Sequence, residues 1–405
     1  MKRIFVFALY SALGLSSLIA QDFSRYVDPR IGSEGLGRTF PGPCMPYGMA
    51  KPGPDAVSMP NAGWAPMPEP VKGFSQMHVS GTGGGQKYGN ILIQPFLDAG
   101  EIIQKRVDEK IALGYYACTF ENGIRTEITA SERCAFYRLD YGRKQKGKLL
   151  IDVATFLGID TIPDKRETQQ YVDSYVTCDG KYAVSGWSTV RGGWNNGGPY
   201  TVYFYLQSDV PLSNSDAPLY NKVKDSKTRL DVAFSKSTVN LKIGISHISI
   251  DQARKNIPAC GFDAQLKNVR KTWNGKLGKI EIAATEKQKR MFYTALYHTM
   301  LMPVDKSGEN PHFSATPYYD DYYAIWDTYR TSMPLLTLIE EPQQRDMVNS
   351  LLNIYKHDGY MPDARSGNWN GRTQGGSNAD IVIADAFAKG MKGIDYELAL
   401  KAMIK

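Results

Sequence analysis

The sequence has few cysteines, and their spacing indicates neither a metal site nor a disulfide framework. Five occur in 405 residues, with no CxxC pair and no zinc-ligand spacing. The dipeptide Asn122-Gly123 predicts a two-residue hairpin turn, which would place Cys118 opposite Glu127 and not opposite Cys134. We therefore expect isolated buried or free thiols at the five positions, which are Cys44, Cys118, Cys134, Cys178 and Cys260.

Blocks of basic residues are also absent. The formal net charge is +7, and subtracting the two charges of Lys2 and Arg3, which belong to the N-terminal segment, leaves +5. Because no cluster of lysine and arginine follows, the sequence carries no signature of nucleic-acid binding.

After its first residues the chain has no apolar run long enough to cross a membrane. The opening MKRIFVFALYSALGLSSLIAQ combines Lys2 and Arg3 with an apolar stretch and a possible cleavage point after Ala20. This pattern is typical of a secretory signal peptide, which we predict at residues 1–20. No cysteine follows the apolar stretch, so we expect no lipid or membrane anchor and export to the periplasm or the extracellular space.

The period of the apolar residues changes along the chain. From residue 22 to about 265 apolar and polar residues alternate in short runs with turn signals between them, as in RLDVAFS and VNLKIGISHISI. This pattern predicts a large antiparallel β-sandwich. After residue 265 a helical period predicts helices over 286–300, 342–357, 378–390 and 395–405, with Asn378 as an N-cap and Gly390 just past a helix end.

The last predicted helix, DYELALKAMIK, has no glycine, proline or polar tail after it. Four or five helices beside a sandwich do not close a helical core of their own. The sequence therefore predicts that the chain is part of a longer protein. The alternative is a complete protein with a small helical appendix.

Aromatic and hydrogen-bonding residues concentrate in YYDDYYAIWDTYR, residues 318–330. Five tyrosines, a tryptophan, three aspartates and an arginine suit neither an aliphatic core nor a charged surface. A sugar site uses both kinds of group, because rings stack on C–H faces while carboxylates and guanidinium groups hold hydroxyls. The glycine-rich GTGGG run could suggest a phosphate-binding loop, but the Lys-Ser/Thr ending and the helix that such a loop needs are missing.

Five motifs in order resemble glycoside hydrolase family 92, the calcium-dependent exo-α-mannosidases. They are VDPRIGSEGLGRTFPGPCMPYGM, GFSQMHVSGTGGG, GGWNNGGPYTVYF, FYTALYHTMLMP and IWDTYRTSMPLLTLI. The resemblance covers residues 25 to 405. It implies an N-terminal antiparallel β-sandwich domain at 21–265, a helical linker at 266–280 and, at 281–405, the first part of an (α/α)6 catalytic barrel that is apparently truncated.

The resemblance also implies inverting hydrolysis of terminal α-linked mannose in glycans, with Ca²⁺ as cofactor and an active site between the two domains. Trp64 matches a sandwich tryptophan that reaches the mannose pocket, and Trp326 and Asp327 match the first barrel residues that touch the sugar. Arg330 lies three residues after Asp327, so the two can share a helix face. The alternatives are an ion pair for Asp327 and Arg330, core packing for Trp326, interdomain packing for the tyrosines and a structural role for His78.

The segment 357–386 departs from the family pattern. Ala364 and Arg365 stand where the α-1,2-mannosidases of the family carry a tryptophan and a glutamate, so the resemblance does not give the linkage. Arg365, Arg372, Asn368 and Gln374 crowd a glycine-rich loop and are further candidates to line the pocket, with Arg365 and Arg372 as predicted substrate-binding residues.

No residue matches the acid, the base or the calcium ligands that the family places in the later half of its barrel. An inverting glycosidase needs two carboxyl groups on either side of the scissile bond. We therefore expect the 405 residues alone to be inactive, and assign no catalytic role to Asp320, Asp321 or Asp363. The alternative function is a non-catalytic mannose-binding protein.

Overall fold

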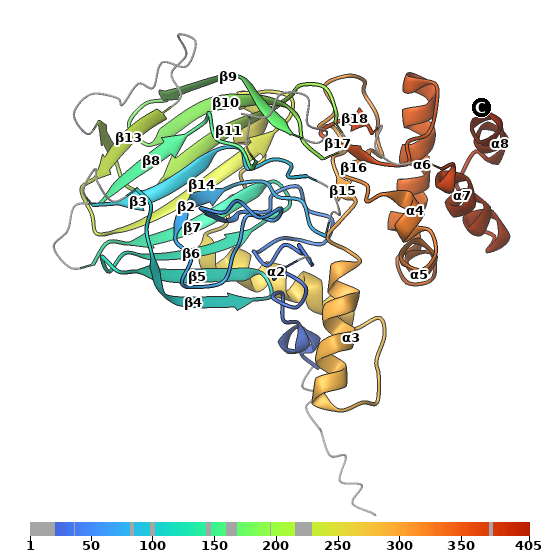
Figure 1. The fold of residues 1–405 in the computed structure, drawn as a ribbon, viewed down its shortest axis with the longest axis horizontal. Coiled ribbons are helices and arrows are strands. Elements are labelled where there is room, and N and C mark those ends of the chain that lie inside the picture. The colour runs from blue at the N-terminus through green and yellow to red at the C-terminus, as the bar shows by residue number, and fades with distance from the viewer. Residues whose placement is uncertain are drawn as a thin grey trace, which may run out of the picture.

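A layered β domain is followed along the chain by a group of helices (Figure 1). The computed structural model describes residues 21–35, 37–81, 85–97, 102–142, 147–158, 168–194, 196–214, 229–371 and 376–405. The predicted signal peptide at 1–20 lies outside these residues. Among the residues described, no helix combines the length and the hydropathy that a membrane span requires.

One layer of the β domain is a six-stranded sheet with the order β1-β2-β3-β8-β13-β12, in which every neighbouring pair is antiparallel. Its strands are β1 Gly53–Ala56, β2 Val71–Ser75, β3 Leu92–Phe96, β8 Lys148–Asp152, β12 Leu212–Asn214 and β13 Arg229–Phe234.

The other layer is an eight-stranded antiparallel sheet with the order β4-β5-β6-β7-β14-β11-β10-β9. Its strands are β4 Arg106–Ala112, β5 Tyr115–Phe120, β6 Arg125–Ala130, β7 Cys134–Asp140, β9 Gln169–Cys178, β10 Ala183–Gly192, β11 Tyr200–Ser208 and β14 Thr238–Ser246.

The main apolar core lies between the two sheets. Phe74 and Ile151 of the first sheet belong to the same buried cluster as Tyr137 and Ile243 of the second. Because successive side chains of a strand point to opposite faces, each sheet buries one face in this core. The predicted antiparallel β-sandwich is confirmed.

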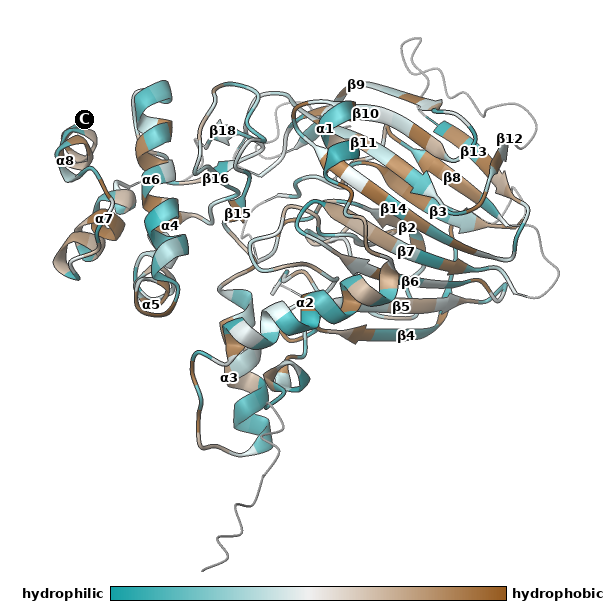
Figure 2. Ribbon diagram, turned by 180° about the vertical axis from the view of Figure 1, so that it is seen from behind, coloured by the Kyte–Doolittle hydropathy of each residue, from teal (hydrophilic) through white to brown (hydrophobic). Residues whose placement is uncertain are grey.

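Helices α1 Ile250–Lys255 and α2 Phe262–Leu277 follow the last long strand and lie against the eight-stranded sheet (Figure 2). Gly244 permits the contact with α1, because a Cβ at this position would lie 2.0 Å from the carbonyl oxygen of Ala253. The second sheet is therefore covered on its outer face as well as its inner one.

The remaining helices enclose a second apolar cluster with the N-terminal 3-10 helix η1 Phe23–Tyr26. They are α3 Glu286–His298, α4 Ile325–Thr328, α5 Ser332–Ile339, α6 Glu341–Asp358, α7 Asn378–Ala388 and α8 Tyr396–Ile404. Two short ladders lie between the sheets and these helices (Figure 1): β15 Val304–Asp305 with β16 Tyr319–Asp320, and β17 Arg365–Ser366 with β18 Trp369–Asn370. The division of the chain at residues 265 and 280 stays a prediction.

Two local predictions are wrong. Cys118 pairs with Thr126, not Glu127, because the Phe120 N–H bonds to the Ile124 carbonyl and the loop contains three residues that end with Gly123 at a φ of 86°. The N-cap of α7 is Ser377, and the Asn378 amide instead donates to Asp363 Oδ1 at 3.2 Å. All five cysteines lie within the described residues, and none of them forms a disulfide there.

Candidate functional site

A cavity of about 520 Å³ lies where the loops of the β domain meet the helices. The β domain contributes residues of three loops and the helical part contributes the end of α3, the segment before α4, α4 itself and α5. The lining residues are Gly37, Thr39, Gly81, Trp194, His298, Thr299, Met302, Pro303, Tyr323, Ala324, Trp326, Asp327, Thr328, Ser332, Met333 and Leu336.

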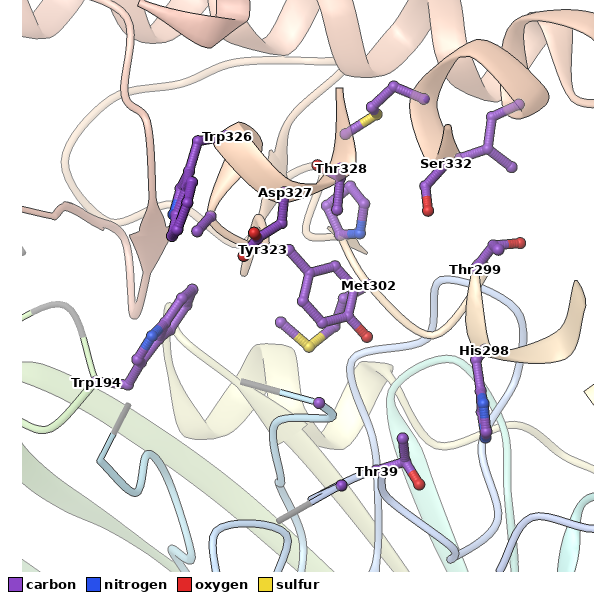
Figure 3. Close-up of a pocket in the computed structure, with 16 residues that line it drawn as sticks. Thr39, Trp194, His298, Thr299, Met302, Tyr323, Trp326, Asp327, Thr328 and Ser332 are labelled. Carbon is purple, nitrogen blue, oxygen red and sulfur yellow. The ribbon is translucent and has the colours of Figure 1, made fainter. Parts of the chain in front are cut away.

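Trp326 and Asp327 enter the cavity from the short helix α4. Ile325, which is fully buried, anchors the start of this helix, and its N–H donates to the Asp363 carbonyl at 2.7 Å. The next two side chains are exposed on the cavity side (Figure 3). The structure thus places both predicted residues on one cavity, and their contact with a sugar stays a prediction.

Trp194 supplies an indole from the opposite, β-domain side. It lies in the connection between β10 and β11, where its backbone N–H donates to the Gln86 carbonyl at 2.9 Å. In Figure 3 Trp194 and Trp326 lie at the same end of the cavity, one from each part of the molecule, with Asp327 beside Trp326. The sequence motif GGWNNGGPYTVYF contained Trp194, but a turn residue of the sandwich gave no signal of its direction, so it was not predicted as a site residue.

The ionisable groups of the cavity are few. Burial lowers the pKa of His298 to about 4, so its imidazole is neutral at pH 7. Its Nε2 is buried without a hydrogen-bond partner in the described part of the chain. Among the described lining residues, Asp327 is the only carboxylic acid. The cavity can therefore bind hydroxyl groups, but these residues do not supply two carboxyl groups.

Asp320 and Asp321, the first two aspartates of the aromatic segment, lie in a buried ion-pair cluster and not in the cavity. Lys306 Nζ is 2.8 Å from Asp320 Oδ2 and 2.9 Å from Asp321 Oδ2, and the lysine and Asp320 are fully buried. Burial would raise the pKa of Asp321, but Lys306 and the hydroxyl groups of Tyr88 and Ser366 hold it at about 2. This cluster joins the β domain to the helical part.

Arg365 belongs to the same cluster. It is 1% exposed, and its guanidinium contacts Asp358 at 2.9 Å, Asp320 at 3.4 Å and the Tyr318 hydroxyl at 3.2 Å. Burial would lower the pKa of Arg365, but Tyr318 and Asp320 raise it above its ordinary value. Arg365 is not among the residues that line the cavity. Arg372, the other arginine that was predicted to bind substrate, lies outside the described residues, as does Gln374.

Asn368 also lies in the buried cluster, where its N–H donates to Asp320 Oδ2 at 2.9 Å. Tyr318 and Tyr322 are fully buried in the helical core, while Tyr323 lines the cavity. Tyr323 also packs against the core between the sheets, so it contacts both parts of the molecule, and for this residue interdomain packing and sugar contact both stay predictions.

Trp64 lies in the core between the sheets, outside the cavity. It is 3% exposed and its indole N–H donates to the Glu109 carboxylate at 3.1 Å. His78 is likewise buried, with Nε2 2.7 Å from Asp55 Oδ1 and the ring stacked on Phe40. The structure thus gives both side chains protein partners.

Arg330 follows α4 and is exposed, with its guanidinium 4.9 Å from the centre of the Tyr329 ring. Among the ion pairs of the described residues none joins it to Asp327, and it does not line the cavity. The structure therefore does not contain the ion pair between Asp327 and Arg330 that was the alternative interpretation.

Metal ligands are not gathered anywhere in the described ranges. No group of three or more His, Cys, Asp or Glu side chains there has an arrangement that could hold an ion. Calcium prefers six to eight oxygen ligands, so the described residues by themselves do not fit a calcium site.

Two family models match the chain in sequence. One, described as the glycosyl hydrolase family 92 N-terminal domain, matches residues 26–246, and the other, described as the family 92 catalytic domain, matches residues 250–405. A curated protein of Arthroderma benhamiae, described as an uncharacterized secreted glycosidase, is 30% identical over 452 aligned residues, which cover 95% of this chain and 52% of that protein.

Solved structures show the same architecture. The family 92 α-mannosidase BT3965 of Bacteroides thetaiotaomicron is 24% identical with a TM-score of 0.82, covering 95% of this chain and 56% of its own. The structure of its complex with mannoimidazole is 25% identical in sequence, with a TM-score of 0.81, and the match covers 95% of this chain and 55% of that chain. The inverting mannosidase BT2199 of the same organism is 25% identical in sequence, with a TM-score of 0.76, and the match covers 95% of this chain and 55% of that chain. The chain thus spans about half the length of these relatives.

Proposed function

The chain belongs to glycoside hydrolase family 92, and from this membership we propose that it serves in the hydrolysis of terminal α-linked mannose from glycans. The observation that carries the proposal is the cavity between the β domain and the helices, with two indoles and a carboxylate on its wall. A solved relative of the same fold binds mannoimidazole. An exported location fits the relative that is described as secreted.

The cavity walls suit a pyranose ring. Trp326, which is 45% exposed, presents its indole to the cavity, and apolar C–H faces of sugars pack on such surfaces. Trp194, which is 2% exposed, closes the cavity from the β-domain side. The Asp327 carboxylate accepts hydrogen bonds from hydroxyl groups, and bonds to a charged acceptor are the stronger kind. Tyr323 and the neutral His298 also line the cavity and add polar atoms to it.

Hydrolysis with inversion is the stereochemical course that we propose, by analogy with the inverting relative. It requires one carboxylic acid to protonate the leaving oxygen and one carboxylate to activate water, with the carboxyl groups about 6.5–9.5 Å apart. Asp327 is the single carboxylic acid among the described lining residues. We therefore propose that the 405 residues alone bind the sugar without hydrolysing the glycosidic bond, and we assign no catalytic acid or base.

The first test is mannose release from a panel of α-linked mannobiosides by the 405-residue chain, with BT3965 as the positive control. We expect release by the control and none above background by this chain. Rapid release by the 405 residues would contradict the proposed inactivity and would show that a second carboxyl group reaches the cavity. The panel would then also identify the preferred linkage.

Sugar binding without catalysis is the second candidate function, and the single carboxylic acid in the described lining favours it. Titration calorimetry with mannoimidazole tests it directly. We expect Trp326→Ala and Asp327→Asn to weaken binding about 10-fold to 100-fold, because each removes an aromatic face or a charged acceptor. Tyr360→Ala is the matched control, since Tyr360 is 48% exposed and Trp326 45%, but only Trp326 lines the cavity. Equal binding by all variants would place the sugar elsewhere.

Calcium dependence is a separate proposal, which rests on the family resemblance. Because the described residues do not gather a set of ligands, any calcium site would need ligands beyond them. Repeating the calorimetry with added calcium and with chelator tests this. If the affinity is the same under both conditions, calcium plays no part in binding by this chain.

A further inference from the structure

A lysine is buried beneath the turn that carries Trp194. The Lys87 side chain is fully buried and its ammonium donates to the Gly192 carbonyl at 2.7 Å. The ammonium also lies 4.7 Å from the centre of the Tyr200 ring. Within the described residues it forms no ion pair and no other hydrogen bond. The bond to Gly192 is therefore the main polar contact of this side chain.

Gly192 is the last residue of β10, and backbone hydrogen bonds hold the turn that follows. The N–H groups of Gly192, Gly193 and Trp194 donate to the carbonyls of Gly197, Thr168 and Gln86 at 2.9, 3.1 and 2.9 Å. Gly192 and Gly193 have φ values of 77° and 79°, a conformation that glycine adopts without strain. Lys87 is thus the one side chain in the described residues that donates a hydrogen bond to this turn at Gly192.

The helical part closes over the same lysine. A Cβ on Gly367, in the turn between β17 and β18, would lie 3.1 Å from Lys87 Cε and 3.2 Å from its Nζ. Burial lowers the pKa of Lys87 to about 7, although the carboxylates of Asp321 and Asp320 oppose the shift. An apolar side chain would fill this space without the desolvation of an amine. Compared with such an apolar side chain, Lys87 adds a hydrogen-bond donor to the Gly192 carbonyl.

We propose that Lys87 is a positioning residue for the cavity: by donating to the Gly192 carbonyl it fixes the turn of Trp194 and so the separation of Trp194 from Trp326. This proposal rests on the proposed function, because the consequence for binding requires that the cavity hold a sugar. The effect on the turn itself does not require a sugar.

The test compares Lys87→Met with Lys51→Met. Methionine keeps most of the apolar stem and removes the donor in both. Lys51 is 1% exposed and its Nζ donates to the Gly48 carbonyl at 2.6 Å. It is therefore a control with the same burial and the same kind of hydrogen bond, but its bond is not to the turn of Trp194, and Lys51 does not line the cavity. Hydrogen exchange of the backbone amides is measured first, without sugar. We expect Lys87→Met to speed exchange at Gly192, Gly193 and Trp194 about tenfold or more, and Lys51→Met to leave these three unchanged.

Calorimetry with mannoimidazole follows on the same proteins. We expect Lys87→Met to raise the dissociation constant about tenfold, and Lys51→Met to leave it near the wild-type value. Equal exchange of the three amides in Lys87→Met and wild type would overturn the proposal. If the wild type itself binds no mannoimidazole, the proposed function fails, while the exchange data still decide the role of Lys87.

A second variant protects the test against misfolding. Lys87→Gln keeps a polar end that is one atom shorter, so it cannot reach the Gly192 carbonyl from the same position. It should speed exchange at the three turn amides as Lys87→Met does. Faster exchange spread evenly over β10, β11 and the turn would mean general loosening of the sheet and would also overturn the proposal.

Discussion

Buried ionisable side chains connect the two parts of the molecule at the residue scale. Besides Lys306, the fully buried Glu309 accepts hydrogen bonds from the Ser246 hydroxyl at 2.6 Å and from the His247 N–H at 2.8 Å. His247 Nδ1–H donates to the Thr201 carbonyl at 2.8 Å, and its Nε2 has no partner in the described residues. A protonated imidazole in this place would carry an unpaired N–H.

Stability should therefore depend on pH through His247. Burial, and then the charge of Lys306, lower its pKa from 6.5 to about 4, while Glu309 and Asp320 act in the opposite direction. Between these values the unfolded chain binds a proton that the folded protein does not, so stability rises with pH and is lost as pH falls. From pH 7.5 to pH 4.5 this residue should reduce the free energy of unfolding by about 2 kcal/mol.

Urea unfolding of wild type and His247→Gln at both pH values measures this contribution. The wild type should lose more stability than the variant on acidification. His357→Gln, which changes an exposed histidine stacked on Phe313, is the control. Equal losses in wild type and His247→Gln would mean that His247 takes up its proton without cost in the folded protein.

At the scale of elements, the hairpin of β17 and β18 docks on the β domain through Trp369. The indole N–H donates to the Pro199 carbonyl at 2.9 Å, and its ring lies on Gly198. A Cβ on Gly198 would be 2.7 Å from Trp369 Cε2. We expect Gly198→Ala to displace the hairpin and to cost about 1–3 kcal/mol of stability, as overpacking does.

Gly275→Ala is the matched control for this change. Gly275 lies in the last turn of α2 and a Cβ there meets nothing within 4 Å. Because alanine is the better helix former, that variant should gain up to about 1 kcal/mol. Urea unfolding midpoints of both variants decide the matter, and a Gly198→Ala protein as stable as the wild type would show that the hairpin moves freely.

Element type followed from the sequence because periodicity reports which faces are buried. The predicted helices at 286–300 and 342–357 correspond to α3 Glu286–His298 and α6 Glu341–Asp358. Partners from distant segments were harder to predict. Arg365 looked like a pocket residue in a glycine-rich loop, but it meets Asp320 and Tyr318 only in the folded chain. Likewise, nothing local distinguishes Trp194, which lines the cavity, from Trp64, which lies in the core.

At the scale of the whole molecule, the most exposed large apolar side chains of the described residues lie in the helical part. Helices α5, α7 and α8 each carry a large apolar side chain that is mostly exposed. Leu338 is 71% exposed, Phe387 65% and Ile404 78%. Exposed apolar groups on several neighbouring helices mark a surface that tends to associate. We therefore expect the 405-residue chain to self-associate through its helical part.

Replacing Leu338 and Leu400 by lysine tests this expectation. Both leucines are exposed, so Leu338→Lys with Leu400→Lys should reduce association while leaving the melting temperature within a few degrees of the wild type. Leu336→Lys is the matched control on α5, because Leu336 is 1% exposed and a lysine there should prevent stable folding of the helical part. Sedimentation velocity over a range of concentrations gives the association, and circular dichroism gives the melting temperature. If the double variant associates as strongly as the wild type, the contact surface lies elsewhere, and the β domain with its exposed Val107 and Tyr182 becomes the next surface to test.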